Sequence, residues 1–65
     1  MPEASASHLR TLAADAEALQ QRLRDALVGL DGLTPGVSFQ LGEAFASLGS
    51  AARTLEAAAS EAAAV

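Results

Sequence analysis

The sequence predicts an all-α fold: a helical hairpin of two antiparallel amphipathic helices, over about residues 6–31 and from residue 35 or 38 to residue 63. Three observations predict it. Alanine and leucine, both strong helix formers, supply 17 and 10 of the 65 residues. Apolar residues recur at helical spacing in two separate stretches. Between these stretches lies a segment of turn-forming residues that includes Pro35 and two glycines, Gly32 and Gly36.

The length of the chain limits it to a single domain, residues 1–65, with a small core of its own. Scaffolds of this size are usually supported by disulfides, by a structural metal or by oligomerisation. The chain has no cysteine and one histidine. We therefore expect it to dimerise, forming a four-helix bundle from two hairpins.

The first expected helix carries a heptad pattern with apolar residues alternately three and four positions apart. The pattern comprises Leu9, Leu12, Ala16, Leu19, Leu23, Ala26, Leu30 and Leu33. Ser5 and Ser7 are suitable N-caps, and we expect residues 1–5 to fray. Gly32 is suited to the left-handed conformation that follows many helix C-termini.

The expected connection allows two starts for the second helix. Thr34 could cap it with Pro35 at the first helical position, or Ser38 could cap it a few residues later. Either start leaves a short connection, which predicts that neighbouring helices run antiparallel.

The second expected helix has a pattern of its own, shifted by one residue from the continuation of the first. It comprises Leu41, Phe45, Leu48, Ala52, Leu55, Ala59 and Ala62. We expect residues 64–65 to fray. The shift indicates two separate apolar faces joined by a turn.

The functional residues that the sequence predicts are those of a helix-packing interface. They are Leu9, Leu12, Leu19, Leu23, Leu30, Leu41, Phe45, Leu48 and Leu55. If the chain folds back about residues 32–37, Leu19 is expected to face Ala52, and Leu23 to face Leu48.

Composition argues against several other classes of function. The net charge of −4, with four dispersed arginines and no lysine, disfavours nucleic-acid and membrane-surface partners. The carboxylates form no close pair, His8 is the single histidine, and no glycine-rich phosphate motif follows a strand, so we expect no enzyme, metal or cofactor. The first seven residues carry no basic residue of a secretory signal, and no apolar run is long enough to span a membrane. A cytoplasmic location is the expectation, with secretion lacking a signal peptide left open.

The alanine and leucine heptads, the Gly/Pro turn and the run Gly42-Glu43-Ala44-Phe45 resemble the small WXG-family, ESX-type helical hairpins of bacteria. That resemblance implies a dimeric substrate of type VII secretion. The chain departs from the family in lacking both a tryptophan in the turn and a tyrosine for the C-terminal export signal. It also resembles the RNA-binding Rop hairpin, in length and topology alone.

From the sequence we expect a small, non-enzymatic module for protein–protein interaction or oligomerisation. Its partner is another copy of the chain or a different helical protein. The alternatives are a secreted ESX-like substrate and, ranked below it, an RNA-binding hairpin.

Overall fold

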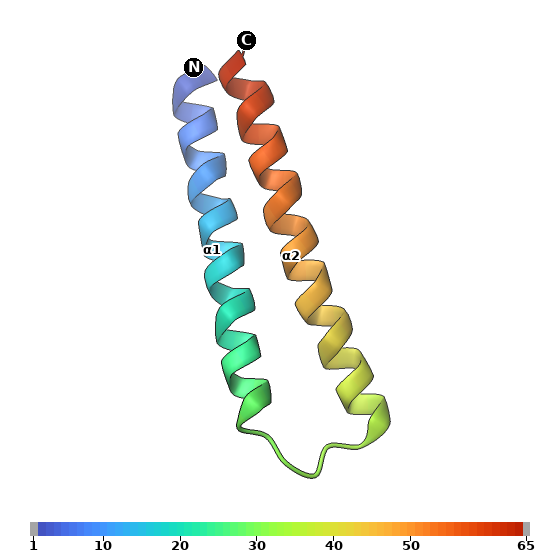
Figure 1. The fold of residues 1–65 in the computed structure, drawn as a ribbon. Helices are drawn as coiled ribbons and strands as arrows, with labels where there is room; N and C mark the ends of the chain where they lie inside the picture. Colours follow the sequence, from blue (N-terminus) through green and yellow to red (C-terminus); the bar gives the residue numbers. More distant parts are fainter. Residues whose placement is uncertain (1, 65) are drawn as a thin grey trace.

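The protein is a pair of antiparallel helices. A computed structural model describes the backbone of residues 2–64 and the side chains of residues 5–64. Helix α1 spans Pro2–Val28 and helix α2 spans Pro35–Ala64. The two lie side by side, with both ends of the chain at one end of the pair and the connection at the other (Figure 1). This arrangement confirms the predicted all-α helical hairpin.

Helix α1 begins and ends earlier than predicted. It starts at Pro2, where a missing N–H is no loss because the first turn has no internal acceptor for it. It ends at Val28, three residues before the expected end, and Gly29 and Leu30 follow with N–H groups that donate to carbonyls three residues back. Gly29 is a poor helix former, and these tighter bonds close the final turn. Of the residues expected to fray, 2–5 and 64 are helical, while Met1 and Val65 lie outside the described residues.

The connection decides between the two predicted starts of the second helix. Helix α2 begins at Pro35, and the Thr34 Oγ1 accepts a hydrogen bond of 3.3 Å from the Val37 N–H. Thr34 is therefore the N-cap, and Ser38 lies inside the first turns. Gly32 has a φ of 71°, as expected for a left-handed residue, but it lies in the middle of the connection rather than directly after α1.

The hairpin is a single layer of structure. Its Cα atoms extend over 49 × 16 × 10 Å. The buried residues among those described are all small: Ala6, Ala13, Gly49, Ala52 and Ala59. Within residues 2–64, neither helix combines the length and the apolarity that a membrane span requires.

Candidate helix-packing interface

Helix α2 presents to α1 the face that its sequence pattern predicts. Every residue of that pattern is at least partly withdrawn from solvent, whereas most other residues of the helix are exposed. Leu41, Phe45, Leu48, Leu55 and Ala62 are half-buried, and Ala52 and Ala59 are buried. All four of the site residues predicted on this helix thus lie on the side that α1 covers.

Helix α1 presents a different face from the predicted one. Leu9 and Leu23 are half-buried as expected, but Leu12, Leu19 and Leu30 are 40%, 47% and 49% exposed. The residues withdrawn from solvent again alternate at spacings of three and four. They are Ala6, Leu9, Ala13, Ala16, Gln20, Leu23 and Leu27.

The two α1 patterns share one row of residues and differ in the row beside it. Leu9, Ala16 and Leu23 belong to both, but the structure pairs them with Ala6, Ala13 and Gln20 rather than with the leucines on their other side. Ala6 and Ala13 are fully buried, because small side chains allow the helices to approach closely. The sequence analysis expected Leu19 to face Ala52, but Leu19 lies outside the row that packs against α2. The apolar pattern did not predict this face, because the polar residue Gln20 interrupts the apolar spacing along it.

Gln20 connects the two helices by a hydrogen bond. Its Nε2 donates to the backbone oxygen of Phe45 over 3.0 Å, in a partly buried position. In an α-helix this carbonyl also accepts the N–H of residue 49, and its second lone pair is free for Gln20.

Gly49 makes room for that hydrogen bond. A Cβ atom at Gly49 would lie 2.5 Å from the Gln20 Nε2 and 3.4 Å from its Cδ. Such a contact would displace the amide, so the glycine and the glutamine act as a pair. Because the pair forms at one level of the hairpin only, it helps to fix how the helices align.

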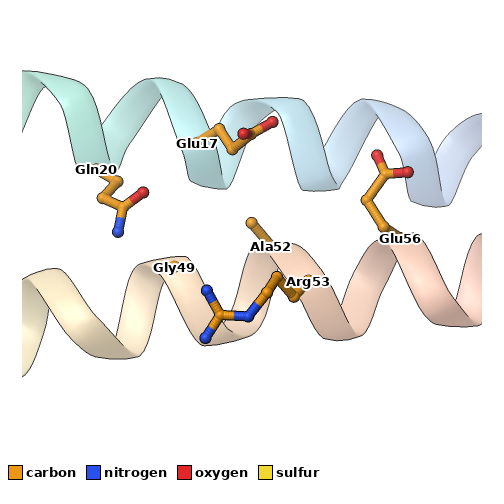
Figure 2. A pocket seen from close by; sticks show the side chains of 6 residues that line it. All are labelled: Glu17, Gln20, Gly49, Ala52, Arg53 and Glu56. Atoms are coloured by element: carbon orange, nitrogen blue, oxygen red, sulfur yellow. The ribbon is translucent and has the colours of Figure 1, made fainter.

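Two hollows lie along the same side of the hairpin. The first, of about 250 Å³, lies beside the Gln20 and Gly49 pair and is lined by charged residues of both helices (Figure 2). Its charged residues are Glu17, Arg53 and Glu56. The second, of about 360 Å³, is nearer the connection and is mostly apolar. Its lining comprises Arg24, Leu27, Val28, Gly42 and Phe45.

Both hollows are open surface features rather than enclosed sites. Four of the residues lining the second lie one heptad from residues lining the first, so the same side of each helix forms both. Within residues 5–64, no group of three or more His, Cys, Asp or Glu side chains is placed to hold a metal ion.

The chain was compared with known families, proteins and structures. No family model, curated protein or solved structure matches it.

Proposed function

We propose that the chain is a non-enzymatic helical module for protein–protein association, which completes its core by packing against further helices. The observation that carries the proposal is the size of the buried side chains. Among residues 5–64, the buried hydrophobic residues are four alanines, and no large side chain is fully buried. Six large apolar side chains are instead exposed: Leu12, Leu19, Val28, Leu30, Val37 and Phe39.

The shape of the hairpin supports the same function. Stable domains consist of at least two packed layers of secondary structure, which enclose a core between them. This hairpin is one layer, whose Cα atoms span 10 Å in the thinnest direction. A second pair of helices would supply the missing layer and cover leucines that are now in water.

The charge of the chain supports apolar rather than electrostatic association. The net charge is −4, and the four arginines are dispersed along both helices. Arg53 lines the same hollow as the acidic residues Glu17 and Glu56 (Figure 2). Burial of apolar surface drives association that salts such as sulfate strengthen, whereas phosphate contacts weaken as salt rises.

The test is a salt series followed by two measurements. Sedimentation equilibrium at micromolar concentration measures self-association, and a fluorescent RNA pool measures nucleic-acid binding. We expect an oligomer that persists or strengthens in sulfate, and no RNA binding near physiological salt. A stably folded monomer throughout the series would contradict the proposal. RNA binding that vanishes with added salt, together with loss of the oligomer, would favour the RNA-binding alternative.

A further inference from the structure

The two long sides of the hairpin differ in chemistry. We call a residue facing when it lies on the side of its helix that packs against the other helix. The residue directly after a facing residue lies toward one long side of the hairpin and the residue directly before it lies toward the other, since each step along a helix rotates by about 100°. The first set, which includes Glu17, Arg24 and Glu56, lies on the side of the two hollows. The second set includes the charged residues Asp15, Arg22 and Glu61, which are turned farther away from the opposite helix. The row of the second set that lies next to the facing residues carries no charge, and we term this row the uncharged face. It comprises Leu12, Leu19 and Ala26 of α1 and Val37, Ala44, Ala51 and Ala58 of α2.

The uncharged face is exposed and forms the central part of a long side of the hairpin. All seven of its residues are exposed, including the two leucines. A long side of the hairpin, 49 Å by 16 Å between Cα atoms, has an area on the order of 800 Å². Interfaces of stable complexes bury about that area on each partner.

We propose that a second copy of this chain docks on the uncharged face, with both connections at the same end and each α1 packed against the partner's α2. This inference rests on the proposed association function and names its partner, its surface and its orientation. All neighbouring helices of the resulting four-helix bundle are antiparallel, which is the favourable arrangement for their dipoles.

The placement of large and small residues supports this orientation. The α1 half of the uncharged face carries leucines, and the α2 half carries mainly alanines. Gln20 contacts α2 at residues 45 and 49, so equal helical rise places Leu19 level with the interval between Ala44 and Ala51. Leu12 is likewise level with the interval between Ala51 and Ala58. A partner with its connection at the same end preserves these levels, so each leucine meets the gap between two of the partner's alanines.

The opposite orientation matches the two faces less well. With the connections at opposite ends, α1 packs on the partner's α1 and α2 on the partner's α2. Leucines then oppose leucines while alanines oppose alanines, which crowds one helix pair and leaves space between the other. Asp15, at the middle of α1 and beside the uncharged face, would also meet the partner's Asp15, and facing like charges are unfavourable.

The orientation is tested by measuring the distance between the two connections. The chain has no cysteine, so an exposed Asp31→Cys variant carries one spin label per copy. With both connections at the same end, we expect a distance of roughly 20 Å, about two helix diameters. A distance near the 49 Å length of the hairpin would overturn the orientation. This measurement keeps the native interface, so it does not depend on a disruptive variant that folds.

The face is tested by two substitutions with matched controls. Leu19→Glu and Ala51→Glu place a carboxylate on the uncharged face, one on each helix. Ala18→Glu and Ala57→Glu place the same charge at exposed positions elsewhere on the same helices. Sedimentation equilibrium is expected to show dimerisation weakened more than about tenfold for the first pair and less than about threefold for the controls.

The possible failures are distinguishable. A dimer that tolerates Leu19→Glu as well as Ala18→Glu would overturn the uncharged face as the docking surface, and the association function would stand. A native chain that is a folded monomer would overturn both proposals.

Discussion

The two halves of the hairpin hold their helices together differently. The terminal half, residues 5–16 and 49–64, contains all of the buried residues: Ala6, Ala13, Gly49, Ala52 and Ala59. The connection half, residues 17–48, contains no buried residue, and five of the six exposed large apolar side chains lie there. Figure 1 shows the two ribbons closer together near the termini than near the connection.

The size of the facing side chains explains the difference. Mainly alanines meet in the terminal half, where the helices approach until their small side chains exclude water. Larger residues meet in the connection half, where Leu23, Leu27 and Phe45 hold the helices apart and remain half-exposed. Two helices thus bury alanines completely but cover only part of a leucine. The connection half therefore has more to gain from a partner.

The largest expected effect comes from truncating a leucine that separates the helices. Leu23→Ala is expected to reduce the free energy of unfolding by about 2 to 3 kcal/mol, the low part of the range for buried leucines, because Leu23 is half-buried. Urea unfolding followed by circular dichroism measures it. The control is Val28→Ala, since Val28 is 83% exposed. A loss at Leu23 no greater than at Val28 would show that α1 presents another face to α2.

Enlarging a buried alanine tests the close approach of the terminal half. Ala13→Leu is expected to destabilise the protein by about 2 kcal/mol, because Ala13 is fully buried and the helices must separate to admit the larger side chain. The neighbouring Ala14 is exposed, and Ala14→Leu is expected to change stability by less than about 0.5 kcal/mol. Thermal unfolding of both variants at one protein concentration measures the difference. Equal stabilities would contradict close packing at this level.

Gly42 and Gly49, which lie one heptad apart, allow a direct comparison of the two halves. A Cβ at Gly42 would meet nothing within 4 Å, so Gly42→Ala is expected to stabilise by about 1 kcal/mol through helix propensity. At Gly49 the same gain is offset by the lost Gln20 hydrogen bond, also worth about 1 kcal/mol, so we expect little net change.

A double-mutant cycle isolates the Gln20 contribution. In a Gln20→Ala background, Gly49→Ala is expected to stabilise as much as Gly42→Ala does, because no amide is left to displace. The readout is the midpoint of urea unfolding. If Gly49→Ala has the same effect with and without Gln20, the two residues are not coupled.

The smallest expected effect concerns the helix start in the connection half. Thr34→Ala removes the hydroxyl that accepts the Val37 N–H, and is expected to cost roughly 0.5 to 1 kcal/mol. Ser38→Ala, which alters the rejected cap, is expected to have little effect. Hydrogen exchange of the first-turn amides of α2 localises the change. A larger loss for Ser38→Ala than for Thr34→Ala would place the start of the helix later than Pro35.

Much of this structure was determined by the sequence alone. Strong helix formers on both sides of a Gly/Pro segment fix two helices and a reversal of direction, because these preferences act locally. The facing residues of α2 could also be predicted, since all large apolar side chains between Leu41 and Ala62 follow one pattern.

The tertiary structure decided what local patterns left open. Helix α1 has two possible apolar faces around Leu9, Ala16 and Leu23, and the stronger one in sequence includes Leu12 and Leu19. The hairpin instead turns Ala13 and Gln20 toward α2. Two features favour that choice. The helix backbones approach closely, and Gln20 donates a hydrogen bond to the Phe45 carbonyl, for which Gly49 leaves space. Both features depend on the shape of the opposite helix. The spacing of apolar residues shows which faces of a helix are apolar. Which of these faces is buried is determined only by packing against the opposite helix.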